Sequence, residues 1–236
     1  MNPREGPLPT RYLWTTSAIS ILVLISSIAG IFVAGTYARD TANWAQQARA
    51  QDVADLVAVC SLAVSAYLAS RRSVRGFLTW AGGILFLIYT FAIYAFASTF
   101  NGLFLVYVAV LGLATYTFIG GVLRLDFEAF GKLSPIGHRA RAPLGVLLIA
   151  LALIFAILWL SQDVPAIITG TVPSIVTQAG LLSNPIHVLD LALYLPAIFM
   201  SGLSLLRNRA LGQVFSLPLL VFSMLEGLGI LLIFAM

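Results

Sequence analysis

Two pairs of polar residues with helical spacing interrupt the apolar segments of this chain. Asp52 and Asp55 are three residues apart, and so are His187 and Asp190. Residues three apart on a helix share one face, so each pair presents its side chains together. Imidazole and carboxylate groups are ligands for zinc, manganese and iron. The pattern therefore suggests a divalent-metal site formed by His187, Asp190 and Asp52, with Asp55 beside them.

Helix capping offers a second explanation of the same four residues. An acidic residue in the first turn of a helix is favoured by the helix dipole. Asn184 followed by Pro185 is typical of a helix start, with Asn as the cap and Pro at the first helical position. The metal hypothesis and the capping hypothesis both remain open at the level of the sequence.

Glu226 is not explained by capping. It lies inside an apolar segment, about ten residues from its end and so roughly 15 Å deep at about 1.5 Å per residue. A carboxyl group at that depth is either protonated and hydrogen-bonded, or it titrates during function. Tyrosine and asparagine side chains are expected in the same half of the bilayer. The predicted binding site consists of Asp52, Asp55, Tyr89, Tyr94, Asn101, His187, Asp190 and Glu226.

The composition shows which elements must carry these residues. Of the 236 residues, 9 % are charged and 60 % are hydrophobic. Soluble domains average roughly 25 % charged residues, so a soluble enzyme, a disulfide scaffold and a disordered chain are excluded. The apolar runs are continuous and do not alternate, which excludes a β-barrel. We expect an all-α membrane protein, a single domain over 1–236 with seven transmembrane helices at about 13–36, 52–70, 77–98, 101–124, 142–161, 185–206 and 212–235.

The basic residues indicate an orientation for these helices. Eleven of the thirteen Lys and Arg residues lie in the N-terminal segment and in the loops after the second, fourth and sixth helices. Arg39 and Arg49 are the two in the remaining loops. Cytoplasmic loops carry an excess of Lys and Arg. We therefore expect a multi-pass plasma-membrane protein with its N-terminus cytoplasmic and its C-terminus outside.

Two short amphipathic helices are expected in the outer loops, at about 41–50 and 172–179. Asp40 precedes an Ala-rich stretch in the first, and Gly180 is a helix stop after the second. The second segment either covers the predicted binding site as a lid or is a plain connecting loop.

An internal repeat is suggested by the second and sixth helices. They open with Asp52-Val-Ala-Asp55-Leu and with His187-Val-Leu-Asp190-Leu, and an Arg-containing turn follows each. The chain then divides into three helices, a linker helix and three helices. This 3+1+3 parallel plan implies a pseudo-two-fold axis along the membrane normal, as in the sugar-transporting SWEET fold.

The chain lacks the residues that several cofactors require. A retinal Schiff base requires a lysine in the last helix, and the one lysine, Lys132, lies in a loop. A b-type haem requires two histidines within the spans, and His187 is the one such residue. We therefore expect no retinal and no haem, and a divalent metal is the one cofactor hypothesis. The net charge of +4 is attributed to the cytoplasmic loops and not to binding of nucleic acid.

The chain also shows a loose resemblance to a known group. Asn184-Pro-Ile-His-Val-Leu-Asp-Leu, with Gln51-Asp52 and Phe100-Asn101, resembles a group of uncharacterised bacterial integral membrane proteins. The likeness covers most of the chain from the second helix onward. It implies a bacterial plasma-membrane location and no specific activity.

Three functions are compatible with these features. The first is a small-solute or ion carrier or binding protein, with Glu226 as a proton-coupled group. The second is a metal-dependent intramembrane enzyme at the outer leaflet. The third is a sensor or accessory subunit, whose small residues pack against a homo-oligomer or a larger membrane complex. We expect the lipid bilayer as a partner in every case.

Overall fold

The structure is a computed structural model that describes residues 8–127, 129 and 136–235, whose regular elements are all helical. Seven helices in this part of the chain are long and apolar enough to cross a membrane, which confirms the expected all-helical architecture and indicates a multi-pass membrane protein. Arg4 and Lys132 lie outside the described residues, and the orientation stays a prediction.

The elements are α1 (Thr10–Phe32), α2 (Ala42–Ser70), α3 (Val74–Ala97), α4 (Phe104–Val122), α6 (His138–Thr169), α7 (Ser174–Ala179), α8 (Pro185–Leu189), the π-helical turn η1 (Asp190–Tyr194), α9 (Leu195–Leu206) and α10 (Ala210–Ala235).

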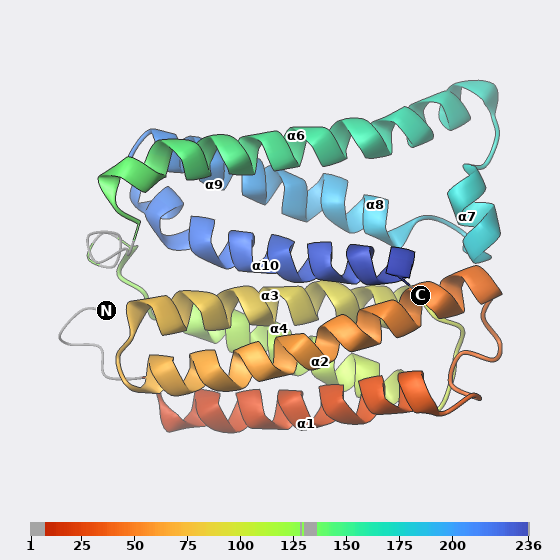
Figure 1. Ribbon diagram of the computed structural model, residues 1–236, viewed down its shortest axis with the longest axis horizontal. Helices are drawn as coiled ribbons and strands as arrows, with labels where there is room; N and C mark the ends of the chain where they lie inside the picture. Colours follow the sequence, from red (N-terminus) through yellow and green to blue (C-terminus); the bar gives the residue numbers. More distant parts are fainter. Residues whose placement is uncertain (1–7, 128, 130–135, 236) are drawn as a thin grey trace.

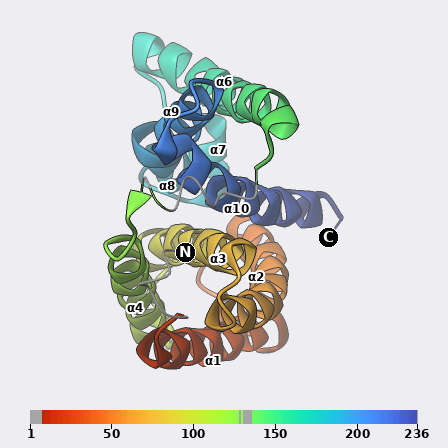
Figure 2. The same ribbon diagram turned by 90° about the vertical axis from the view of Figure 1, so that its left-hand side faces the viewer.

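The helices form two groups that lie side by side (Figures 1 and 2). Helices α1 to α4 form the first group, and α6, α8–α9 and α10 form the second. Helix α10 joins them because it packs against both α3 and α2. Helix α4, the predicted linker, packs against α1 and α3 and so belongs to the first group. The parallel repeat stays a prediction.

The two ends of the bundle differ in what connects the helices (Figure 1). One end, called the α7 end below, carries α7 and the segments 33–41 and 98–103. Helix α10 also finishes there. The other end, called the opposite end, carries the start of α1 and the turns 71–73 and 207–209.

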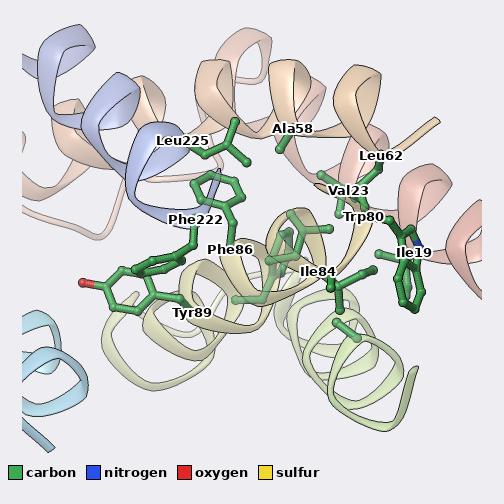
Figure 3. Packing of buried hydrophobic residues seen from close by; sticks show 14 of the residues in the cluster. Ile19, Val23, Ala58, Leu62, Trp80, Ile84, Phe86, Tyr89, Phe222 and Leu225 are labelled. Carbon is green, nitrogen blue, oxygen red and sulfur yellow. The ribbon is translucent and has the colours of Figure 1, made fainter. Parts of the chain in front are cut away.

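A shared hydrophobic core explains why α10 is held against the first group. Figure 3 shows Phe86 of α3 beside Phe222 and Leu225 of α10, in one cluster with residues of α1 and α2. Trp80 is wholly buried in this core. Its Nε1 donates a hydrogen bond to Thr16 Oγ1 at 3.0 Å, so the polar atom of the indole is satisfied.

The expected helices 41–50 and 52–70 are one continuous helix, α2. Thr41 is the N-cap and accepts a hydrogen bond from the Trp44 backbone N–H. Asp40, the expected cap, accepts a hydrogen bond from Thr99 N at 2.8 Å instead. At the junction of the two expected segments, the side-chain amide of Gln51 donates to Thr90 Oγ1 of α3 at 3.0 Å. The Ala-rich stretch before it also has a high helix propensity.

The fifth long helix extends beyond its expected end at residue 161. Helix α6 runs to Thr169 and ends at Gly170, which adopts the left-handed conformation. Pro165 lies inside the helix and not in a loop. The extra turns carry Asp163 to the α7 end, where it meets the start of α8. Helix α7 closes this loop and ends at Gly180, as expected for the segment 172–179.

Candidate functional site

Asp52 lies at the centre of a buried hydrogen-bond network inside the first helix group. It is wholly buried. Its carboxylate accepts hydrogen bonds from the hydroxyl of Tyr37 at 2.9 Å and from the hydroxyl of Tyr94 at 3.1 Å. The Tyr94 hydroxyl also lies 3.0 Å from the carbonyl oxygen of Ala48. A buried carboxyl group requires such partners, because leaving it unpaired costs several kcal/mol.

Tyr37 comes from the segment that joins α1 to α2, outside the helices. Burial beside the Asp52 carboxyl raises the pKa of its hydroxyl well above the usual value of 10. The hydroxyl therefore remains a hydrogen-bond donor at any physiological pH. The sequence indicated no role for Tyr37, because a loop tyrosine near a membrane surface is ordinarily an interface residue.

Asp55 lies one turn further along α2 and is also wholly buried. Neither of its carboxylate oxygens has a hydrogen-bond partner among the described residues. The side chain of Ser27 on α1 is its polar neighbour, and Glu226 of α10 is close enough to interact with it electrostatically. Asp55 thus stands between the network around Asp52 and the second helix group.

Asn101 serves the structure of the α3–α4 connection. Its Oδ1 accepts a hydrogen bond from the backbone N–H of Leu103 at 2.9 Å, just before α4 begins. Tyr107 in α4 packs against Tyr94, with ring centroids 5.2 Å apart. Asn101 therefore stabilises the turn before α4, whose N-cap is Leu103.

A second polar group joins α6 to the α8–η1 segment. Nδ1 of His187 lies 2.9 Å from a carboxylate oxygen of Asp163. The ring of His187 stacks on Trp159, with centroids 4.4 Å apart and planes inclined by 28°. Trp159 Nε1 donates a hydrogen bond to Asp190 at 2.8 Å. The predicted residues His187 and Asp190 are thus linked to one another through side chains of α6.

Trp159 and Asp163 were not among the predicted site residues. They are four apart near the end of α6 and so share one helix face. That spacing was the available signal. It was missed because the helix was expected to end at residue 161, which would place Asp163 in a loop.

The π-helical turn Asp190–Tyr194 sets the direction of both of its terminal side chains. The backbone N–H of Leu195 donates to the carbonyl of Asp190, which is the i to i−5 bond of a π-helix. Pro196 in the first turn of α9 has no N–H, so the α-helical hydrogen bond to the carbonyl of Ala192 cannot form. Such wide turns occur frequently at functional sites. Here the turn places Asp190 and Tyr194 on the wall of a cavity.

This first cavity has a volume of about 890 Å³ and lies between the two helix groups toward the α7 end. Its lining is mainly apolar and includes side chains from α2, α3, α6, α7, α9 and α10. Among the described residues that line it, Asp190 and Glu226 are the charged ones. The aromatic members of the lining are Trp44, Tyr89, Tyr94, Phe155, Trp159, Tyr194 and Phe222.

Three aromatic rings form the inner wall of the first cavity. The rings of Tyr194 and Phe222 stack, with centroids 4.5 Å apart. Tyr89 meets each of them edge-on, at 4.9 Å and 5.4 Å. In Figure 3 the Tyr89 ring lies at the margin of the core and its hydroxyl points away from the cluster. We call Tyr89, Tyr194 and Phe222 the aromatic wall.

Glu226 lies beside the aromatic wall. Its Oε1 is enclosed and has no hydrogen-bond partner among the described residues. Asp190, across the wall, is close enough for the two carboxyl groups to interact electrostatically. The Glu226 carboxyl group therefore faces the interior of the protein.

A second cavity of about 480 Å³ lies toward the opposite end. Its lining includes residues of α9 and α10 that are nearer that end, such as Ser204 and Phe215, together with Leu85 of α3 and Phe118 of α4. Tyr194 belongs to the lining of both cavities. One aromatic residue therefore stands where the two cavities approach one another.

The eight predicted binding residues are not all brought together. Tyr89, Tyr94, Asp190 and Glu226 line the first cavity. Asp52 and Asp55 lie within the first helix group, Asn101 lies in the α3–α4 connection, and His187 is buried behind Trp159. The described residues contain no group of three His, Cys, Asp or Glu side chains that could hold a metal ion. The hypothetical metal ligands His187, Asp190 and Asp52 are not brought together, because the first two contact α6 and the third contacts Tyr37 and Tyr94.

Comparisons with known proteins add no relative from which a function could be transferred. No family model matches the chain, and neither a curated protein nor a solved structure matches it. The class of this protein therefore rests on its fold. The protein is a multi-pass helical membrane protein with seven helices capable of crossing a membrane in the described part of the chain.

Proposed function

We propose that this protein is a carrier for a small solute in a bacterial plasma membrane. The observation that carries the proposal is the pair of cavities on successive halves of α9 and α10, with Tyr194 in the lining of both. A carrier needs a binding site that opens to each side of the membrane in turn. A barrier of one aromatic residue between two cavities suits that requirement.

The proposed orientation follows from the distribution of Lys and Arg, which puts the N-terminus in the cytoplasm. The α7 end then faces outward, and the first cavity is the outer one. Ile175 of α7 is part of its lining, which supports the view of α7 as a cover.

Residue roles follow from these positions. Asp190, Tyr89 and Tyr94 contact the solute in the first cavity. Glu226 exchanges a proton as the solute binds and leaves, because its carboxyl group lines the cavity and has an enclosed oxygen without a partner among the described residues. His187 acts indirectly, by holding Trp159 against Asp190.

Cysteine labelling tests the carrier proposal without knowledge of the solute. In a Cys60→Ser background, Ser223→Cys introduces a thiol into the first cavity and Ser204→Cys introduces one into the second. Sealed vesicles of both orientations are treated with the membrane-impermeant reagent 2-(trimethylammonium)ethyl methanethiosulfonate. We expect the two thiols to react from opposite sides of the membrane, because the first cavity lies toward the α7 end and the second toward the opposite end.

The wild-type chain supplies the matched control. Cys60 lies on an exposed face of α2 and outside both cavity linings, so a lipid-facing thiol should react from neither side. Reaction of both introduced thiols from the same side would contradict alternating access. Reaction of neither would show that the cavities are closed to water, and would also count against a carrier.

A further inference from the structure

We propose that the solute of the first cavity is an organic cation, in which a positively charged group is attached to an apolar group about as large as an aromatic ring. The inference rests on the proposed function, since it assumes that this cavity binds a solute. It adds the chemical class, which follows from charge, ring geometry and volume.

The carboxyl groups of the cavity lining are its most distinctive polar groups. Asp190 and Glu226 come from different helices and are the charged residues among the described members of the lining. One oxygen of Asp190 accepts the hydrogen bond from Trp159 Nε1 at 2.8 Å. Glu226 Oε1 has no partner among the described residues. Two carboxyl groups within electrostatic reach of each other favour a cation between them.

The aromatic wall provides a second attraction for a cation. A positive charge over the face of an aromatic ring is attracted by the electrons of the ring, and the effect grows when water is excluded. Tyr89, Tyr194 and Phe222 are mutually packed at centroid distances of 4.5 to 5.4 Å, and all three line the cavity. Proteins bind quaternary ammonium groups with aromatic rings that face the ligand, and the sides of these three rings that are not packed within the wall are the ones available to the cation.

The size and the remaining lining favour an organic ligand over a bare metal ion. A volume of about 890 Å³ lies within the range of pockets for drug-sized molecules, roughly 300–1,000 Å³. Most of the remaining lining is aliphatic, including Leu147 and Leu151 of α6 and Ile198 of α9. An inorganic cation would leave these side chains without a partner. A neutral solute would gain nothing from a second carboxyl group close to the first.

A matched pair of ligands tests the charge requirement. Benzyltrimethylammonium and its neutral carbon analogue, neopentylbenzene, have almost the same shape and differ in the positive charge. Binding of radiolabelled benzyltrimethylammonium to the purified full-length protein is measured in detergent, with either unlabelled compound as competitor. We expect the cation to compete at least about tenfold more strongly than the neutral analogue.

Variants of the two carboxyl groups show whether the charge is recognised at this cavity. Glu226→Gln and Asp190→Asn remove one negative charge each, and the amide introduced by Asp190→Asn retains an oxygen to accept the Trp159 hydrogen bond. We expect each to weaken binding of the cation about tenfold or more and to leave competition by the neutral compound unchanged. Asp40→Asn is the control, because it removes a carboxyl group near the same end but outside the cavity lining. Thermal unfolding of each variant checks that the fold is retained.

Each outcome separates the inference from the proposed function. Equal competition by the two compounds would overturn the cation class and leave the carrier proposal standing. Binding of the cation that is insensitive to both Glu226→Gln and Asp190→Asn would place its site elsewhere, which would also overturn the inference. Absence of binding by both compounds would contradict the inference, and the cysteine labelling would then decide separately whether the carrier proposal survives.

Discussion

At the scale of single residues, the buried carboxyl group of Asp52 is stabilised by two tyrosine hydroxyl groups and by a glycine that leaves room for it. Asp52 is wholly buried and depends on Tyr37 and Tyr94. Gly30 of α1 lies directly against this network, since a methyl group there would overlap the Asp52 carboxylate and crowd the Tyr37 hydroxyl. The position requires glycine because of this contact and not because of its backbone conformation.

Gly30→Ala should therefore destabilise the protein. Overpacking of a well-packed interior costs about 1–3 kcal/mol, and each kcal/mol lowers Tm by roughly 2–4 °C for a chain of this size. Thermal unfolding in detergent measures the effect. Gly112→Ala in α4 is the matched control, because a methyl group there meets no atom and alanine favours the helix. A Tm for Gly30→Ala equal to that of the control would refute the packing argument.

At the scale of elements, the connection between α6 and α8 determines the outer boundary of the first cavity. Helix α7 packs against the start of α2, where the Thr41 hydroxyl donates a hydrogen bond to the carbonyl of Ala179 at 3.1 Å. Gly180 ends α7 with a φ of +70°, a conformation that L-residues other than glycine seldom adopt. The end of α7 thus depends on both backbone conformation and a contact.

Two glycine substitutions separate these contributions. Gly170 has a nearly identical φ of +66° but open space around it, whereas a methyl group on residue 180 would crowd Thr41. Alanine in this conformation costs about 1–2 kcal/mol in either case. We expect Gly180→Ala to accelerate hydrogen exchange of the amides at the end of α7 about fivefold or more, and Gly170→Ala to accelerate exchange at the end of α6 much less. Equal acceleration would show that the contact with Thr41 contributes nothing.

At the scale of the whole molecule, the two helix groups meet along α3 and α10, and Tyr194 of the aromatic wall lines both cavities. Tyr194 is held there by stacking on Phe222 and by its hydroxyl, which donates to the carbonyl of Leu85 at 3.3 Å. The separation of the cavities is therefore a property of the packing between groups. It follows from one ring at the end of the π-helical turn.

Removal of that ring should join the cavities. We expect Tyr194→Ala in proteoliposomes to raise the passive proton leak about tenfold, measured with an entrapped pH-sensitive dye, because a continuous wetted path would form. Tyr194→Phe retains the ring and should leak no more than the wild-type protein. An unchanged leak in Tyr194→Ala would mean that Tyr89 and Phe222 close the path without it.

The membrane class and the seven helices were predictable from composition and apolar run length, because few charged residues cannot cover a water-exposed surface. The polar residues of the site were also predictable as types, since an ionisable group inside an apolar segment is costly. Which of these polar residues lie next to one another in the folded protein was not predictable. The sequence suggested that Asp52, His187 and Asp190 converge, whereas His187 and Asp190 contact α6 and Asp52 contacts Tyr37 and Tyr94.

What the sequence by itself determined is the class of protein, the helices and the presence of Glu226 and Asp190 within them. Only the tertiary structure decided that these two carboxyl groups share a cavity with the aromatic wall, that Asp52 pairs with Tyr37, and that His187 pairs with Asp163. Periodicity assigns a side chain to a face of its own helix. Which neighbour that face meets depends on the packing of all the helices together, which no local spacing contains.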